Sequence, residues 1–460
     1  MANNNDFFDD FFDMLTFKGQ ATRKARLNRF TNPLQQFIKT EIAGGIIILI
    51  AVLSALIIAN SPFDSIYYDF VHFKIKLSFG NFLISGDLHY WINDAAMVIF
   101  FFLVGTEIKR EVLVGELSDK KSLMVPIFAA LGGMIFPVII FLIMVNNPDA
   151  ISGWGIPMAT DIAIALGAIA LLGKRVPPGL KVMLLAIAII DDIGSILVIA
   201  LFYTETISVI ALLAVLSLLI LISLLNYYGI RSMFTYIVIA IIAWIFASKS
   251  GVHPTILGVA LGFMTPWKPW YSPHFFPEIA DKLLARIKDN LKNQDDDEPH
   301  NHKNDQALIE MSTIAAETVA PLQRVEKILL PWSAFLIVPI FAFVNAGINV
   351  TGGALSASLN SSVTYAIAFG LFFGKPIGIT LGAWIAVKTG SKLPRSVNFT
   401  NIFGMGMLAG IGFTVALFIT ELAYVDEFLL RDAKVGILIA SFLAGIFGLM
   451  MLKMTSNSNK

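Results

Sequence analysis

Apolar runs of similar length follow one another along this chain, separated by short polar segments. A helix needs about 20 mostly apolar residues to cross the hydrocarbon core of a bilayer, so each long run predicts one membrane-spanning helix. Twelve spans are predicted, at about 42–60, 90–112, 123–145, 156–172, 180–203, 207–226, 233–250, 253–266, 331–348, 362–387, 400–420 and 434–453. The chain is therefore predicted to be an all-α polytopic membrane protein, although 253–266 is too short to cross upright by itself.

The polar segments divide the chain into predicted regions. These are a cytoplasmic tail at 1–40, transmembrane helices 1–8 over 41–266, a hydrophilic cytoplasmic insert at 267–330, helices 9–12 over 331–453 and a tail at 454–460. Within 70–86, apolar and polar residues alternate about Gly80 and Asn81, which is typical of a β-hairpin outside the membrane. The N-terminal tail is either solvated or an amphipathic segment on the bilayer surface. The acidic core of the insert, Asn293 to His302, is expected to be disordered rather than metal-binding.

Composition and charge narrow the class of protein. Hydrophobic residues make up 56% of the chain and charged residues only 14%, whereas a soluble protein carries about 25% charged residues. A net charge of zero argues against nucleic-acid binding, and the absence of cysteine excludes disulfides and thiol catalysis. Most of the 33 Lys and Arg residues fall on one side of the predicted membrane, and the other side holds Lys74, Lys76, Lys249, Arg431 and Lys434. Because Lys and Arg mark the cytoplasmic side, both termini are predicted to be cytoplasmic.

Few ionisable residues lie at the predicted membrane depth: Asp94, Asp161, Asp191, Asp192 and Lys375. Asp191 and Asp192 are adjacent in the middle of an apolar run, and one Asp at the centre of a membrane helix costs roughly 2.5–3.5 kcal/mol on insertion scales. Such a pair indicates an ion or proton site in a transporter. The two side chains point about 100° apart around a helix. One can therefore line a water-filled cavity while the other faces a neighbour such as Lys375.

Two of the predicted spans contain residues that interrupt a helix. In the fourth, two glycines and Pro157 weaken the helix, and Thr160 and Asp161 follow where a helix could restart. Glycines over 404–412 interrupt the eleventh, with close helix packing as the alternative explanation. Because the two breaks lie in the middle spans of the third-to-fifth and tenth-to-twelfth triplets, they indicate inverted-topology repeats. Four half-helix ends would meet at the midplane, where Asp161 and Lys375 can balance their partial charges.

Two further residues have more than one interpretation. His253 begins the short eighth span and is expected at an interface, with a pH-linked role as the alternative. Asp94 starts the second span and is either an N-cap or structural partner, or part of a proton path.

Together these motifs resemble the NhaA-type Na+/H+ antiporter family. The matching stretches lie in order between about 28 and 453, and their combination is far more specific than any one of them. They are Trp91–Asp94, Val104–Gly105, Glu107–Glu111, Ala159–Ala163, Ala188–Asp192, Ser250–His253, Phe341–Gly347, Gly374–Pro376 and Ala409–Thr414. The resemblance implies twelve helices, of which the fourth and eleventh are interrupted and cross, and a homodimer joined through the hairpin at 70–86.

The resemblance also implies roles for individual residues. Asp192 and Asp191 would form the Na+ and proton site, with Asp191 paired to Lys375 and with Thr160 and Asp161 in support. The residues of a pH-sensing cluster at the cytoplasmic funnel would be Glu107, Arg110, Glu111, Arg324 and Glu326. This chain departs from the family at Lys327 and Leu330, where histidines are frequent, and in its long acidic insert; both bear on the pH set-point.

The predicted function is that of an electrogenic, pH-regulated antiporter in the bacterial cytoplasmic (inner) membrane. It would extrude Na+, or Li+, in exchange for H+, because both ions compete for the same carboxylate oxygens; two carboxylates predict two protons per cation. No cofactor or enzymatic activity is expected, and the partners are Na+, Li+, H+, the bilayer and a second copy of the chain. One alternative is a Na+-coupled symporter, and another is an intramembrane aspartyl protease that uses Asp161 and Asp192. A purely structural membrane protein leaves the buried charges unexplained.

Overall fold

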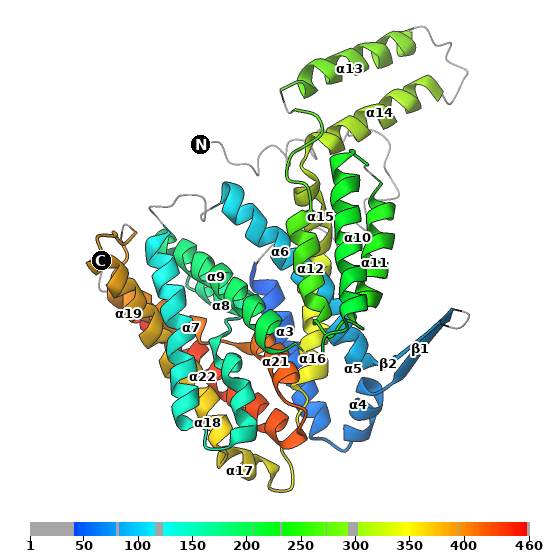
Figure 1. Ribbon diagram of the computed structural model, residues 1–460. Helices are drawn as coiled ribbons and strands as arrows, with labels where there is room; N and C mark the ends of the chain where they lie inside the picture. Colours follow the sequence, from blue (N-terminus) through cyan, green and yellow to red (C-terminus); the bar gives the residue numbers. More distant parts are fainter. Residues whose placement is uncertain are drawn as a thin grey trace.

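The computed structural model describes residues 41–79, 82–115, 123–204, 206–230, 232–272, 274–292, 302–394 and 396–457. These residues form a bundle of apolar helices from which two pairs of elements project: helices α13 (Phe276–Lys292) and α14 (His302–Thr318), and strands β1 (Lys74–Phe79) and β2 (Phe82–Asp87) (Figure 1). The strands pair antiparallel, with Lys74 opposite Asp87. The predicted tail at 1–40, the acidic core of the insert at 293–301 and the Gly80–Asn81 turn lie outside the described residues.

Most helices of the bundle follow the predicted apolar runs. In chain order they are α3 (Glu41–Ala59), α4 (Asp64–Val71), α5 (Leu88–Tyr90), η1 (Trp91–Ala96), α6 (Met97–Val114), α7 (Met124–Met144), η3 (Pro148–Met158), α8 (Ile162–Leu171), η4 (Gly173–Arg175), α9 (Pro178–Phe202), α10 (Val209–Tyr227), α11 (Met233–Ala247), α12 (Pro254–Met264), α15 (Pro321–Trp332), η5 (Ser333–Ile337), α16 (Val338–Ala346), α17 (Ala354–Leu359), α18 (Ser362–Phe369), η6 (Gly370–Gly374), α19 (Lys375–Lys388), α20 (Phe399–Ala409), α21 (Phe413–Ala423) and α22 (Glu427–Asn457). Of these, α4, η4 and α17 lie in segments between the predicted spans. Elements η3 and η4 are 3-10 helices, and η1, η5 and η6 are π-helical turns.

Many of these helices have the length and apolarity to cross a membrane. Among the described residues there are six such helices, or up to nine spans if each of three bent helix pairs counts as one. Two shorter apolar helices, α11 and α12, add to them. Helix α6 is not among the six, and its last turns carry four charged residues between Glu107 and Glu111. The helical membrane-protein class is thus confirmed, whereas the count of twelve spans and their topology stay predictions.

The ninth span begins earlier than the sequence predicted. A helical stretch runs from Pro321 to Ala346 through α15, η5 and α16, whereas a start at 331 was expected. Proline suits the first turn of a helix, where its missing N–H is no loss. Because α15 contains the charged residues Arg324 and Glu326, its sequence resembles that of the hydrophilic insert. The predicted boundary at 330 therefore falls inside a helix.

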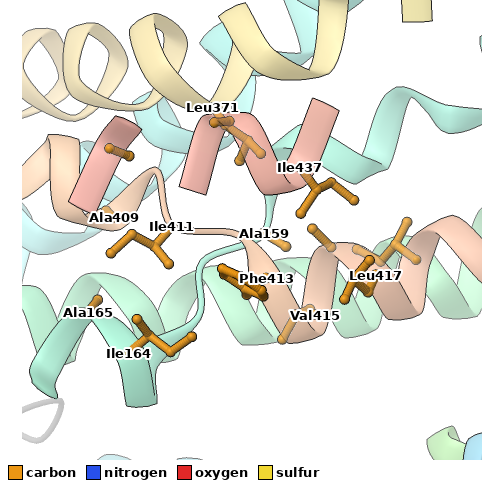
Figure 2. Close-up of a cluster of buried hydrophobic side chains, with 14 of the residues drawn as sticks. Ala159, Ile164, Ala165, Leu371, Ala409, Ile411, Phe413, Val415, Leu417 and Ile437 are labelled. Atoms are coloured by element: carbon orange, nitrogen blue, oxygen red, sulfur yellow. The ribbon is translucent and has the colours of Figure 1, made fainter. Parts of the chain in front are cut away.

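The interruptions predicted in the fourth and eleventh spans are present. The axes of η3 and α8 differ by 45°, and those of α20 and α21 by 50°. Figure 2 shows the extended stretch through Ile411 alongside the stretch through Ala159, with Leu371 and Phe413 packed around them. The fourth span begins at Pro148 rather than at the predicted 156. Its first half is a 3-10 helix, which rises about 2.0 Å per residue instead of about 1.5 Å, and its polar start at Asn147 to Asp149 resembles a loop in sequence.

Glycines also bring α7 and α19 into backbone contact. A Cβ atom added to Gly378 would lie 2.1 Å from the carbonyl oxygen of Gly132, and one added to Gly382 would lie 1.9 Å from that of Phe128. Residues four apart share one helix face, so Gly374 at the end of η6 and Gly378 and Gly382 of α19 form a stripe of glycines, called here the glycine stripe of α19. This stripe allows α19 to approach α7 closely, and Lys375 at the start of α19 contacts Asp191 of α9.

The variant Gly378→Ala is expected to destabilise the protein. Its methyl group would overlap backbone that cannot move aside, and overpacking of this kind costs about 1–3 kcal/mol. The matched control is Gly445→Ala in α22, where the nearest atom to an added Cβ is the Ile411 Cδ1 at 3.7 Å. The control should be neutral or stabilising, because Ala is the better helix former. Thermal unfolding of both variants in detergent measures the difference, and equal midpoints would contradict the packing argument.

Candidate functional site

The two interrupted spans are joined to each other at their breaks. The backbone N–H of Asp161 donates a hydrogen bond of 2.7 Å to the carbonyl oxygen of Ile411. The Thr160 hydroxyl lies 2.9 Å from the carbonyl oxygen of Ala409 and can donate to it. Backbone groups at one break are therefore satisfied by the residues of the other break: the N–H of Asp161 and the carbonyl oxygens of Ile411 and Ala409.

The carboxylate of Asp161 caps two helices at once. Its Oδ1 accepts a hydrogen bond of 3.0 Å from the N–H of Ile164 at the start of α8. Its Oδ2 accepts from both the N–H and the hydroxyl of Thr414, at 3.1 and 2.6 Å, at the start of α21. Helix N-termini carry partial positive charge, so one buried carboxylate balances two of them. The restart predicted at Thr160 and Asp161 is confirmed, and the second cap is an addition to that prediction.

Replacing Asp161 with Ala is therefore expected to cost more than the loss of an ordinary cap. One lost N-cap costs about 0.5–2 kcal/mol, and here two helices lose theirs. The control is Ser232→Ala at the start of α11. It removes only one N-cap hydrogen bond, which the N–H of Thr235 donates to Ser232 Oγ at 3.4 Å. Thermal unfolding should show the larger loss for Asp161→Ala. Equal losses would mean that Asp161 does not hold both helices.

Lys375 and Asp191 form an ion pair in the protein interior. Both side chains are fully buried, at 0% exposure. The ammonium group of Lys375 also donates a hydrogen bond of 2.8 Å to the Thr160 hydroxyl. That hydroxyl lies 2.7 Å from Asp191 Oδ2, so its single proton is shared between Asp191 and the carbonyl oxygen of Ala409. The structure thus brings Thr160, Asp191 and Lys375 together, the pairing that the resemblance implied.

Asp192 differs from its neighbour in both exposure and contacts. Its side chain is only half-buried, and within the described ranges it makes no hydrogen bond or ion pair. It lies beside the face of α9 where Ile189 and Ile193 pack against Val104 and Ile108 of α6. A carboxylate that is accessible and uncommitted is able to bind a cation or a proton. The two adjacent acids therefore have different environments, as the helical geometry required.

Most of the residues proposed for pH sensing lie together where α6 meets α15. Arg110 forms ion pairs with Glu111 at 3.1 Å and Glu107 at 3.9 Å on α6, and with Glu326 on α15. Arg324 lies on the same helix as Glu326, and its buried Nε has no hydrogen-bond partner among the described residues. The arrangement is a cluster of charges shared between two helices.

His253 lies apart from that cluster and pairs with Asp94. The His253 Nε2 is 3.3 Å from Asp94 Oδ1, while its Nδ1 accepts a 3.4 Å hydrogen bond from the N–H of Thr255 at the start of α12. The N-cap interpretation of Asp94 is wrong, because the helix begins earlier, at α5. There Asp87 accepts the capping hydrogen bond from Tyr90, and Asp94 lies in the π-helical turn η1.

A second charge cluster, made of half-buried side chains, was not predicted from the sequence. Glu421 of α21 pairs with Lys434 of α22 at 2.6 Å and with His89 of α5 at 3.3 Å. The His89 ring also lies 3.1 Å from Asn345 Oδ1 of α16. The predicted spans ended at 420 and began at 90 and 434, so these charges fell at or just beyond the span limits. Span limits drawn one turn wider would have found them.

Known proteins are similar to this chain over nearly its whole length. The family model described as "Na+/H+ antiporter 1" matches residues 35–452. The protein named Na+/H+ antiporter NhaA 2 of Sorangium cellulosum is 41% identical over 415 residues, covering 90% of this chain and 88% of that protein. Na+/H+ antiporter NhaA of Koribacter versatilis is 41% identical over 437 residues, covering 95% and 94%. Its namesake in Oleidesulfovibrio alaskensis is 41% identical over 435 residues, covering 93% and 95%.

Proposed function

This chain belongs to the Na+/H+ antiporter 1 family, the NhaA-type antiporters, which are multi-pass membrane transporters and not enzymes, and on that premise we propose that it extrudes Na+ in exchange for H+. The observation that carries the assignment of the site is the contrast between the two adjacent acids. Asp191 is fully buried and paired with Lys375, whereas Asp192 is only half-buried and makes no hydrogen bond or ion pair with the described residues. Asp192 is then the residue at which Na+ and H+ compete, next to the crossing of the interrupted helices.

The exchange cycle follows from that competition. When the site faces the outer medium, where protons are plentiful, protonation of the carboxylates releases Na+. When it faces a more alkaline cytoplasm, the carboxylates lose their protons and accept Na+. With Asp191 and Asp192 both taking part, two protons move per Na+, so each cycle carries net charge across the membrane. Li+ is a second substrate, because the ligands are hard oxygen atoms.

We also assign a role to the charge cluster around Arg110 and positions to the two termini and the hairpin. The charge cluster around Arg110 links α6 to α15 and adjusts activity to cytoplasmic pH, since protonation of its three carboxylates would weaken that link. In this proposal the protein lies in the bacterial inner membrane, and both of its termini are on the cytoplasmic side. The hairpin of β1 and β2 lies outside and joins two copies of the chain.

The competing functions make different use of the same residues. An aspartyl protease needs two acids free to hold one water, but the Asp161 carboxylate is committed to capping α8 and α21. A Na+-coupled symporter remains the second candidate only if an organic solute proves necessary for ion flux. The family to which the chain belongs favours exchange of Na+ for H+.

The test is a transport assay in everted membrane vesicles that contain a pH-sensitive dye. Addition of Na+ after acidification of the vesicles should restore the dye fluorescence, and the response should rise with pH and with an imposed membrane potential. No response to Na+ would refute Na+/H+ exchange. A fluorescence response that does not change with the membrane potential would refute the exchange of two protons per Na+. A response that requires an organic solute would support the symporter.

A further inference from the structure

Two buried oxygen atoms of α9 have no hydrogen-bond partner among the described residues. They are Oδ1 of Asp191, whose Oδ2 is the atom that contacts Lys375 and Thr160, and Oγ of Ser195. The two side chains are 0% and 1% exposed, so bulk water does not reach them. Buried polar atoms in native proteins are nearly always satisfied, and an exception calls for an explanation such as a bound ion or a functional role.

The position of Ser195 on the helix relates it to both acids. Helix α9 is continuous from Pro178 to Phe202. Ser195 follows Asp191 by four residues and Asp192 by three, and these are the spacings at which helix side chains are neighbours. Around the axis it lies about 40° from Asp191 and about 60° from Asp192, between the two. The hydroxyl therefore shares one patch of α9 with both carboxylates.

Ser195 does not make the contact that buried hydroxyls in helices usually make. A Ser or Thr inside a helix commonly donates to the carbonyl three or four residues earlier. In this protein Thr106 does so to Leu103 at 2.7 Å, and Thr420 does so to Ala416 at 2.8 Å. The Ser195 hydroxyl makes no such hydrogen bond and accepts none from the described residues, so its lone pairs are not engaged by them.

We propose that Ser195 supplies its hydroxyl oxygen as a ligand of the transported cation, beside Asp191 Oδ1 and the carboxylate of Asp192. The inference rests on the proposed function of those two acids and adds a neutral ligand to them. A hydroxyl binds Na+ or Li+ through its lone pairs, but it takes up no proton at physiological pH. Ser195 therefore strengthens cation binding without strengthening proton binding, and so sets the balance between the two competing ions.

The experiment compares Ser195→Ala with Ser441→Ala in the vesicle assay. Ser441 lies on α22, is 3% exposed, and its hydroxyl is likewise buried without a partner, so the control removes the same group away from the acids. Ser195→Ala should raise the apparent KM for Na+ about tenfold, which corresponds to ~1.4 kcal/mol. Its maximal rate should be retained, and its activity at fixed Na+ should shift towards higher pH, because protons then compete better. Ser441→Ala should match the wild type.

Further measurements separate ligation from a structural role. Neither Ala variant loses a hydrogen bond to a described residue, so the thermal unfolding midpoint of each should stay equal or rise. Ser195→Thr should keep a low KM, because it keeps the hydroxyl. If Ser195→Ala has an unchanged KM while the separate variant Asp192→Asn is inactive, the role of Ser195 alone is overturned. Exchange that survives Asp192→Asn would overturn the proposed site and the role of Ser195 together. If Ser195→Ala raises the KM but also lowers the thermal unfolding midpoint, its effect is structural, and the proposed role of Ser195 as a ligand would be overturned.

Discussion

Replacing Asp192 with Asn is expected to abolish Na+-dependent proton exchange while leaving the fold intact. Asn has nearly the size of Asp, but it can neither attract a cation by charge nor exchange a proton. The Asp192 carboxylate makes no hydrogen bond or ion pair within the described residues, so the substitution breaks no contact. A neutral amide also costs less to bury than a carboxylate, so thermal stability should equal or exceed that of the wild type. Dye-loaded everted vesicles and thermal unfolding of the purified protein measure the two effects.

The control for this result is Asp69→Asn, which makes the same chemical change on an exposed side chain of α4. It should leave both exchange and stability as they are. Residual Na+-driven flux in Asp192→Asn would mean that the cation is held elsewhere. Loss of flux together with a lowered unfolding midpoint would mean that Asp192 has a structural task instead.

The helices were largely predictable because the bilayer fixes both their length and their apolarity. The predicted helix boundaries are wrong where a helix begins with polar or charged residues. Helix α15 carries charges near its start and so resembled the insert, although Pro321 marked a helix start. The segment η3 begins with polar residues and winds as a 3-10 helix, so it was shortened in the prediction. In both cases polar residues near the start of a helix made its sequence resemble a loop, although packing against neighbouring helices stabilises the helix.

The site was predictable only in part, because sequence reveals costly residues but not their partners. Asp161, Asp191, Asp192 and Lys375 stood out as charges in apolar runs. Helical geometry said that the two adjacent acids must differ, yet the choice of Asp191 as the partner of Lys375 came from the family resemblance. Contacts across 215 positions, such as that of Lys375 with Thr160, have no local signal in one sequence. Ser195 was overlooked for the opposite reason, since a serine in a membrane helix is unremarkable until its hydroxyl is found without a partner.

Removing the positive charge of Lys375 is expected to destabilise the protein strongly. In Lys375→Met the side chain keeps its volume, but Asp191 is left as a buried charge without its counter-ion. Breaking a buried ion pair in this way costs roughly 3–5 kcal/mol. The control is Lys388→Met at the exposed end of the same helix, which should change little. Thermal unfolding in detergent measures the cost, and a wild-type midpoint for Lys375→Met would contradict the ion pair.

A double variant shows that the cost lies in the uncompensated charge of Asp191. Adding Asp191→Asn to Lys375→Met removes both charges, and replacing a whole buried pair by neutral groups is often neutral or stabilising. Most of the lost stability should therefore return, although exchange should not. In the single variant, acid should also reduce the defect, because protonation of Asp191 neutralises the unpaired charge, so the gap to wild type should narrow as pH falls. If the double variant is instead as unstable as the sum of its parts, Lys375 contributes through packing along the glycine stripe of α19 and not through its charge.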